Sequence, residues 1–509
     1  MAQMLNTVGL LIISVVCLRL YKLSSELWRR RDLCHSHHCK PIPRYQHADG
    51  LWRTLLPKQR AEAYATGRAA PFTQSLFKEY GKTWLEPSWN QTKIHTCDPK
   101  NIQAVTATAF GEFGIEPLRA GLSAPFIDRG ILNTDGVFWS HSRALIRPTF
   151  SRAQISDFES YEKHFRQLLA LIPKDGSTID LQPLLKRLYL DTSTEFFLGE
   201  SVESLSQESS FDAQDFLSSF DKALKGVGKR QQLGRFRFLH RWDPEWKSAV
   251  SKVHAFIDRY VENALSSQQQ RHSKSAKSRD DEYGNRKKIT LLQEMAKETS
   301  DKIELRNQIL NVFFPARDST AIAVSNTIYL LARHPRVWEK LRAEVGKLEG
   351  TDLTFESLKS LAYLRYTVNE AIRLHSPIHE SFRMCLKSTV LPCGGGQNGD
   401  FPFLVHKGQV VAMHVYSLHR DESIWGADAE DFRPERWEGR RVGWEYVPFL
   451  GGPRICPAQN MVLAEISYVL TRLLQEFSAI ENRDPEPWAE EHRMTAESRH
   501  GCKVALIAC

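Results

Sequence analysis

One segment says more about this chain than any other: Pro448-Phe449-Leu450-Gly451-Gly452-Pro453-Arg454-Ile455-Cys456. It places a cysteine after a Gly-Gly-Pro turn, with an arginine two residues and a phenylalanine seven residues before the cysteine. Glycines let a backbone approach a flat group closely, an arginine can neutralise a carboxylate, and an aromatic ring can shield sulfur. The pattern therefore predicts that Cys456 is a thiolate ligand of heme iron, with Phe449 and Arg454 beside the cofactor. A buried, unreactive cysteine on a turn is the alternative.

The composition is that of an ordinary globular protein with a sizeable core. Of the 509 residues, 42% are hydrophobic and 25% are charged, and the formal net charge is +8. This charge favours an anionic membrane surface or an acidic protein partner over nucleic acid, because no basic helix interleaved with aromatic residues stands out. The nine cysteines are odd in number and scattered, which indicates a reducing compartment rather than a disulfide framework.

The N-terminus predicts a membrane anchor. Residues 4–18 form an apolar run, and basic residues such as those at 29–31 follow it. A cleavable signal peptide carries its charge first, whereas charge on the far side leaves the bulk of the chain cytosolic. We expect residues 1–21 to form a single-pass transmembrane anchor, with an interfacial helix as the alternative because the run is short for a span. Residues 22–43, which are basic and contain prolines, are expected to connect the anchor to a domain of residues 44–509.

Helical periodicity dominates the remainder of the chain. The expected helical regions are residues 70–265 with an interruption at 201–214, then 302–333, 335 to between 346 and 350, 361–374 and 461–477. Short strand-like runs at residues 388–391, 401–405 and 409–414 predict small sheets. Residues 268–288 are polar enough to form a solvated loop. We therefore predict a mainly α fold with small β-sheets.

Two motifs before the cysteine complete a known arrangement. Glu370 and Arg373 lie three residues apart on an expected helix, so their side chains can pair, and Arg436 follows in the segment Phe432–Trp437. In their order before Cys456, these residues resemble the Glu-x-x-Arg motif, the Pro-Glu-Arg-Phe-like segment and the heme loop of the cytochromes P-450. The resemblance implies the cytochrome P-450 fold, with Glu370, Arg373 and Arg436 interlocked beneath the heme loop as structural residues.

The resemblance also implies contacts with the heme propionates. Trp139 and Arg143 form a Trp-x-x-x-Arg pair one helical turn apart, in the position where the family presents a donor pair to a propionate. Arg454 and Arg383 are expected to bind the same anionic groups. Packing of Trp139 and solvation of Arg143 are the alternative for that pair considered by itself.

The helix that handles oxygen departs from the family pattern. Where the family typically has Ala/Gly-Gly-x-Asp/Glu-Thr-Thr, this chain has Pro315-Ala316-Arg317-Asp318-Ser319-Thr320. The resemblance implies catalytic roles for Asp318, Ser319 and Thr320, since an acid and a hydroxyl for a proton relay are retained. Ala316 puts a methyl group where glycine leaves a groove, and Pro315 removes a helix hydrogen bond and should kink the helix. The kink either restores the lost room or accompanies altered oxygen activation.

A second departure follows the cysteine. Cys456 precedes Pro457-Ala458, whereas the family commonly has glycine two residues after the cysteine. Backbone N–H groups after the cysteine typically donate to the sulfur, and Pro457 has none. Fewer donors predict a more basic thiolate and a lower reduction potential of the iron.

Further segments look like those of the fungal cytochromes P-450 that hydroxylate alkanes and fatty acids. They are residues 391–399, Lys407-Gly408, His419-Arg420 and residues 432–437. The resemblance implies an endoplasmic-reticulum membrane enzyme that binds heme and receives electrons from an NADPH-dependent flavoprotein reductase. The altered oxygen helix suggests a divergent member that tailors a specialised metabolite. The glycosylation-type triplet at Asn90 is expected to be unused, because the predicted topology keeps it cytosolic.

The expected function is that of a membrane-bound heme-thiolate monooxygenase. It uses O2 to hydroxylate or oxidise an apolar substrate, which is aliphatic, fatty-acyl or a specialised metabolite. Two alternatives stay open: the same fold catalysing desaturation, rearrangement or coupling, and a heme-binding protein with impaired turnover. The substrate is not specified, because the pocket of this family is lined by loops whose residues a single sequence does not align.

Overall fold

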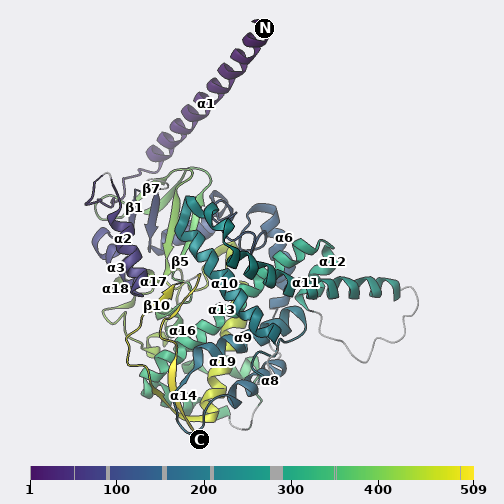
Figure 1. The fold of residues 1–509 in the computed structure, drawn as a ribbon. Helices are drawn as coiled ribbons and strands as arrows, with labels where there is room; N and C mark the ends of the chain where they lie inside the picture. The colour runs from purple at the N-terminus through teal and green to yellow at the C-terminus, as the bar shows by residue number, and fades with distance from the viewer. Residues whose placement is uncertain are drawn as a thin grey trace.

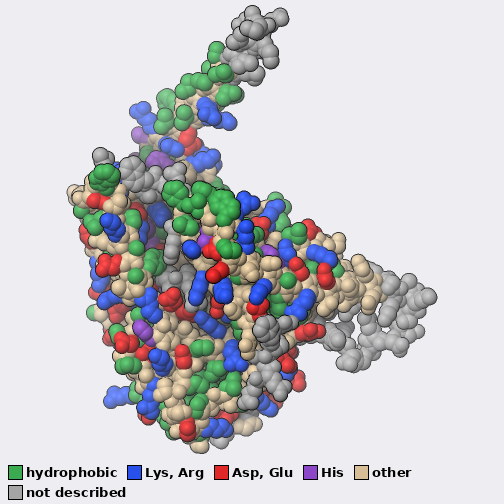
Figure 2. All heavy atoms as spheres, in the orientation of Figure 1, with side chains coloured by type: hydrophobic (Ala, Val, Ile, Leu, Met, Phe, Trp, Pro, Cys, Tyr) green, Lys and Arg blue, Asp and Glu red, His purple; other side chains and the backbone are tan. Residues whose placement is uncertain are grey.

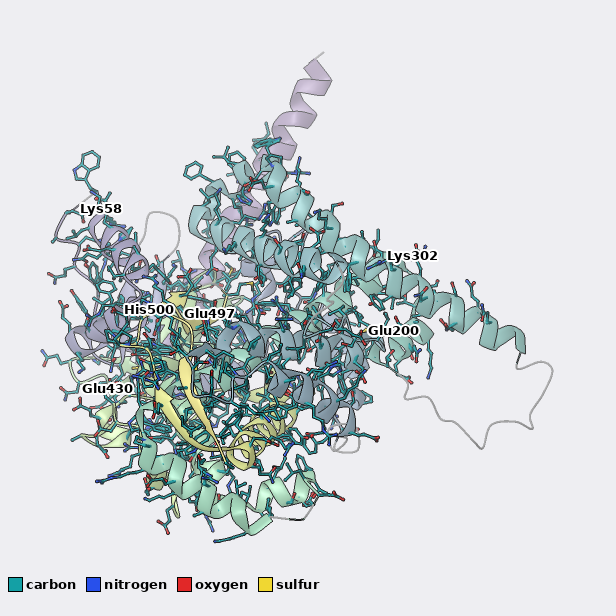
Figure 3. The ribbon with its side chains drawn as sticks, turned by 60° about the horizontal axis from the view of Figure 1, so that its bottom comes forward. Lys58, Glu200, Lys302, Glu430, Glu497 and His500 are labelled. Carbon is teal, nitrogen blue, oxygen red and sulfur yellow. The ribbon has the colours of Figure 1, made fainter. Side chains whose placement is uncertain are left out.

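Helices make up most of the molecule, and the strands gather on one side of it (Figure 1). The computed structural model describes residues 2–50, 52–87, 92–151, 158–206, 211–274, 290–348, 350, 352–492 and 494–509. Lys58 and Glu430 mark the side with the strands, and Glu200 and Lys302 mark the opposite, helical side (Figure 3). Asn90 and most of the expected polar loop lie outside the described residues.

The described helices and strands have the following bounds, and none of these strands lies between residues 198 and 362. The α-helices are α1 (Ala2–Ser36), α2 (Leu55–Ala65), α3 (Ala69–Tyr80), α4 (Pro99–Gln103), α5 (Glu116–Arg119), α6 (Gly136–Ile146), α8 (Glu159–Ala170), α9 (Leu181–Leu198), α10 (Phe211–Leu233), α11 (Pro244–Lys274), α12 (Leu291–Glu298), α13 (Lys302–Arg333), α14 (Pro335–Val345), α15 (Phe355–Ser360), α16 (Ala362–Leu374), α17 (Val415–Leu418), α18 (Glu422–Trp425) and α19 (Gln459–Glu476). The strands are β1 (Thr83–Glu86), β2 (Lys93–Thr96), β3 (Phe113–Gly114), β4 (Ile179–Asp180), β5 (Glu380–Cys385), β6 (Thr389–Gly395), β7 (Phe401–Val405), β8 (Val410–His414), β9 (Phe477–Asn482), β10 (Glu490–His492), β11 (Ala496–Ser498) and β12 (Lys503–Ala508).

The helix α13 forms the centre of the helical side. It begins where the Asp301 side chain accepts hydrogen bonds from the N–H groups of Ile303 and Glu304, and it ends just before Pro335. A helix that is buried on every side belongs to the interior of a protein. Within residues 307–332 every residue is buried except Pro315, Ala316 and Ser319. α13 packs against α9, α16 and α19, and α19 is the helix that follows Cys456.

Four small sheets complete the described part of the fold. The largest has the strand order β1-β2-β8-β5-β3, in which only β2 and β8 run parallel. The others are the three-stranded sheet β4-β12-β9 and the pairs β6-β7 and β10-β11. The strand β5 follows α16, which carries Glu370, and β5 itself carries Arg383. The sheets therefore position residues of the candidate site as well as covering one side of the core.

The helix α1 projects away from the body of the protein, and hydrophobic side chains follow it outward (Figures 1 and 2). It runs without interruption to Ser36, so the first part of the expected connector is helical. Its base is held to the β6-β7 pair, because Arg29 Nη2 donates to the carbonyl of Ser388 at 2.8 Å and the Lys40 N–H donates to the carbonyl of Pro402 at 2.8 Å. Among the described residues, no helix has both the length and the apolar character that crossing a membrane requires.

The predicted secondary structure is confirmed for the long helices and for three strands, but several short strands were predicted as helix. α13, α14, α16 and α19, and the strands β6, β7 and β8, occupy the predicted regions within a few residues. The region 70–265 was expected to be helical, yet it contains β1, β2, β3 and β4. These strands are two to four residues long. In such short segments the alternation of apolar and polar residues typical of a strand cannot be distinguished from the surrounding helical pattern. Residues 268–274, expected in a loop, instead extend α11.

Candidate heme-thiolate site

The cysteine loop is closed by its own backbone. The N–H of Cys456 donates to the carbonyl of Phe449 at 3.1 Å, and the N–H of Ile455 donates to that of Gly452 at 3.1 Å. A short 3-10 turn, Gly452–Arg454, lies between them. Cys456 itself is partly exposed and precedes the first turn of α19 by three residues. The sulfur is therefore presented by a folded loop at the start of a helix.

Glycine at position 452 is required by two features of this loop. Its φ is +69°, a conformation that L side chains rarely adopt. A Cβ atom there would lie 1.9 Å from the carbonyl oxygen of Thr106, in the short π-helix Ala104–Thr108. The loop and this turn are thus in direct backbone contact, and only a residue without a side chain permits it.

The groups around the Cys456 thiol have opposing effects on its pKa. Burial raises the pKa of the thiol, while a hydrogen bond from the backbone of Ala458 and the positive charge of Arg143 lower that pKa. The N-terminal end of α19 adds its partial positive charge. Pro457 supplies no donor, but the next residue does, so the sulfur retains one backbone hydrogen bond.

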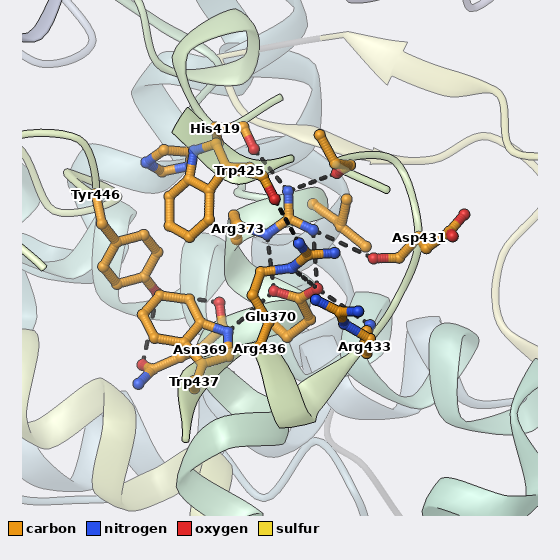
Figure 4. A network of polar contacts seen from close by, with 12 residues as sticks. Asn369, Glu370, Arg373, His419, Trp425, Asp431, Arg433, Arg436, Trp437 and Tyr446 are labelled. Carbon is orange, nitrogen blue, oxygen red and sulfur yellow. Dashed lines mark hydrogen bonds and ion pairs between the residues drawn. The ribbon is translucent and has the colours of Figure 1, made fainter. Parts of the chain in front are cut away.

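A fully buried carboxylate organises the segment beneath the loop (Figure 4). Glu370 accepts hydrogen bonds from Arg373 at 2.7 and 2.8 Å and from Arg436 Nε at 3.1 Å. It also accepts from Trp437 Nε1 at 2.9 Å and from the N–H of Arg433 at 3.1 Å. The Glu370 and Arg373 side chains are both 0% exposed, so neither charge has water as an alternative partner.

This network reaches the cysteine loop through a histidine. Arg373 Nη1 donates to the carbonyl of His419 at 2.6 Å, and the N–H of Val447 donates to His419 Nε2 at 3.0 Å. Val447 immediately precedes the cysteine loop. Next to it, the Tyr446 hydroxyl donates to the carbonyl of Asn369 at 3.1 Å, in the helix that carries Glu370. The start of the loop is therefore fixed to the network at two consecutive residues.

Arg454 lies in a buried polar cluster on the other side of the loop. Its Nη2 contacts Asp135 at 2.7 Å and donates to the carbonyl of Thr134 at 2.6 Å. Its guanidinium carbon is 4.4 Å from the centre of the Trp139 ring, within the range of a cation–π contact. Arg143 lies nearby and donates to the carbonyl of Ile455 at 3.0 Å. Both ends of the Trp-x-x-x-Arg pair therefore contact the cysteine loop.

Positive charge exceeds negative charge in this cluster. Burial lowers the pKa of Arg454 to about 10, that of Arg383 to about 9 and that of Arg119 to about 10. The arginines also repel one another, whereas the one acidic side chain that acts on all three is Asp135. Such a cluster fits an anionic group, and the two carboxylates of heme would satisfy it. Arg119 was not predicted from the sequence, because its position at the end of α5 matches no local motif.

The candidate oxygen helix presents three partly exposed residues on its buried middle. They are Pro315, Ala316 and Ser319, where positions 315 and 319 are one turn apart. The helix is continuous through Pro315, and the Ser319 hydroxyl donates to the carbonyl of Pro315 at 2.5 Å. Asp318 and Thr320 are buried, at 8% and 1% exposed. Burial raises the pKa of the Asp318 carboxyl, and Arg317 is the strongest opposing influence.

Comparison with known proteins agrees with this site. The family model "Cytochrome P450" matches residues 59–502. The chain is 36% identical to the cytochrome P450 monooxygenase himC of Aspergillus japonicus, over 97% of this chain and 88% of that protein. It is 37% identical to fsdH of Fusarium heterosporum, with the same coverage, and 38% identical to iccC of Talaromyces variabilis, over 92% of each chain; both are cytochrome P450 monooxygenases. The chain therefore belongs to the cytochrome P450 family of heme-thiolate proteins and is a monooxygenase of the fungal type.

Replacing Gly452 tests the close contact of the loop. We expect Gly452→Ala to lower the heme-loaded fraction and the thermal stability of the protein, because the new methyl group meets backbone that cannot move aside. Gly439→Ala is the control: Gly439 has φ +64° but no atom within 4 Å of its Cβ position, so it should cost only about 1–2 kcal/mol. Equal heme loading and melting temperature of the two variants would contradict the assignment.

Neutralising Glu370 tests the network beneath the loop. Glu370→Gln leaves the buried Arg373 guanidinium without a counter-charge and Arg436 with Asp428 alone, so the free energy of unfolding should fall by about 3–5 kcal/mol. The matched control is Glu435→Gln, because Glu435 is in the same segment as Arg436 but pairs at the surface with Lys340 at 2.6 Å. Chemical denaturation measures both. A Glu370→Gln loss no larger than that of the control would count against the network.

Proposed function

We propose that this protein inserts one oxygen atom from O2 into an apolar substrate, aliphatic, fatty-acyl or a specialised metabolite, using electrons from an NADPH-dependent flavoprotein reductase. The observation that carries this proposal is the cysteine loop, which presents the Cys456 sulfur between the Glu370 network and the cluster around Arg454. Heme bound there supplies the oxygen chemistry, because thiolate ligation favours O–O cleavage.

Each site residue has a proposed role, and its position supports that role. Cys456 would bind the heme iron through its thiolate, with Phe449 in the same closed loop. The propionates would be held by a cluster of cationic and aromatic side chains: Arg119, Trp139, Arg143, Arg383 and Arg454. Glu370, Arg373 and Arg436 hold the segment from which the loop departs.

Proton delivery is assigned to the middle of α13. The Ser319 hydroxyl lies on the partly exposed face of the helix and keeps its proton on the carbonyl of Pro315. A small rotation about its Cα–Cβ bond would direct that proton away from the backbone. Asp318, whose pKa is raised by burial, is the acid that resupplies it, and Thr320 carries the second hydroxyl of the group.

Isotope labelling tests the proposed reaction. Microsomes containing the protein and its reductase are given NADPH and ¹⁸O2 with panels of fatty acids, polyketides and terpenes. We expect one ¹⁸O atom in each product molecule. Ser319→Ala or Asp318→Asn should lower product formation by roughly 10²-fold or more while peroxide rises, since general-acid catalysis is lost. Ser325→Ala, on a later turn of the same buried helix, is the matched control.

Two results would contradict oxygen insertion. A product that lacks two hydrogens and carries no ¹⁸O would indicate desaturation. NADPH consumption that yields peroxide alone with every substrate of the panels would indicate impaired turnover.

We further propose that residues 1–21 anchor the protein in the endoplasmic-reticulum membrane, with residues 44–509 forming the catalytic domain in the cytosol. Exposed apolar side chains on α1 support the anchor: Ile12, Ile13, Val15, Val16, Leu18 and Leu20. Carbonate extraction should leave the full chain in the membrane pellet and release a chain that lacks residues 1–21. Recovery of the full chain in the supernatant would contradict the anchor.

Adding a donor beside the sulfur tests the effect of Pro457. Pro457→Leu restores one backbone N–H next to Cys456, in addition to the hydrogen bond from Ala458. Hydrogen bonds to a thiolate ligand withdraw electron density, so the reduction potential of the heme should rise. Potentiometric titration measures it, and an unchanged or lower potential in folded, heme-loaded protein would show that position 457 does not set the electron density of the sulfur.

A further inference from the structure

Arg317 is a buried cation in the middle of the candidate oxygen helix. It lies between Ala316 and Asp318, and its side chain is 1% exposed. Taking a guanidinium group out of water is costly unless charged or polar groups compensate it. The partners of Arg317 therefore show how its buried charge is compensated.

Two carboxylates share one nitrogen of this guanidinium. Arg317 Nη1 donates a hydrogen bond to Asp221 Oδ1 at 3.2 Å, and the same nitrogen is 3.3 Å from Asp318 Oδ1. Asp221 belongs to α10, whereas Asp318 follows Arg317 in α13. The guanidinium carbon also lies 5.1 Å from the ring centre of Phe220, the neighbour of Asp221.

The geometry favours the partner on α10. Asp318 Oδ1 accepts no hydrogen bond from the described residues, and Arg317 Nε has no hydrogen-bond partner among them either. Asp221 thus orients the guanidinium through a hydrogen bond, whereas Asp318 interacts with the guanidinium by charge attraction without a hydrogen bond. Loss of Asp221 would leave the guanidinium free to turn toward Asp318.

Four charged groups on four elements act on Asp318. Arg317 of α13 and Lys186 of α9 favour its ionised form, whereas Asp221 of α10 and Glu497 of β11 oppose it. Lys186 is already engaged, since its Nζ lies 2.5 Å from Glu497 Oε2. Arg317 is therefore the cation with the most influence on this acid, and Asp221 controls how much of that influence it exerts.

We infer that Arg317 is a positioning residue for Asp318, and that its ion pair with Asp221 couples the placement of α10 to the proton affinity of that acid. The inference rests on the proposed proton-delivery role of Asp318. The helix α10 packs Phe220 against Phe313 of α13, with 5.7 Å between the ring centres. Through the ion pair of Asp221 with Arg317, a movement of α10 would also act on proton delivery. A displacement of α10 that separates Asp221 from Arg317 would strengthen the attraction between Arg317 and the Asp318 carboxylate, and would lower the proton affinity of Asp318.

Infrared titration of the Asp318 carboxyl in the heme-loaded protein tests the inference without turnover. The protonated-carboxyl band is assigned by its absence in Asp318→Asn. Arg317→Gln should raise the pKa of Asp318 by about one unit or more, and Arg317→Lys should restore part of the difference. Asp221→Asn should lower it, because one negative charge is gone and Arg317 is released. Asp215→Asn is the control on the same helix, since Asp215 pairs with Lys252 at 2.7 Å, and should change nothing.

The double variant separates coupling through Arg317 from a direct charge effect. In the Arg317→Gln background, Asp221→Asn should shift the pKa of Asp318 much less than it does in the native chain. An equal shift in both backgrounds, or no shift in Arg317→Gln, would overturn the inference. Neither result bears on whether the enzyme inserts oxygen, so failure here and failure of the labelling experiment are distinguishable.

Discussion

Two buried arginines share one buried carboxylate, that of Glu370. Arg373 and Arg436 are both withdrawn from water and both pair with Glu370. Arg436 has a second counter-charge in Asp428 at 2.8 Å, whereas Arg373 pairs with no other carboxylate among the described residues. Their remaining N–H groups are directed at backbone carbonyls of residues 419–431, among them those of His419, Trp425 and Ala429. The charge requirement therefore becomes a requirement on chain path, because these segments must come close for the hydrogen bonds to form.

That path determines where the cysteine is presented. His419, held by Arg373 through its carbonyl, uses its ring to bind the N–H of Val447. From Val447 the chain turns through Gly452 against Thr106 and reaches Cys456 at the start of α19. On the other side, Arg454 is fixed by Asp135 and the carbonyl of Thr134. The loop is thus restrained at both ends, as pre-organised ligation of a metal requires.

Some of this site follows from sequence, and some does not. The pairing of Glu370 with Arg373 is predictable because residues three apart share a helix face. The contact of Arg436 with Glu370 is predictable only from the family pattern. His419, Arg119 and the Arg317–Asp221 pair depend on segments that tertiary packing brings together, and no local spacing encodes them. The missing donor at Pro457 is evident from the sequence because proline has no N–H, whereas the hydrogen bond from Ala458 depends on the path of the loop.

The account as a whole depends on a thiolate from Cys456 ligating heme iron. The carbon monoxide difference spectrum of the reduced protein reports this ligation directly. The account predicts the red-shifted Soret band of a thiolate-ligated heme in the native protein and its loss in Cys456→Ala. A folded, heme-loaded protein without that band, or a band that survives in Cys456→Ala, would contradict it.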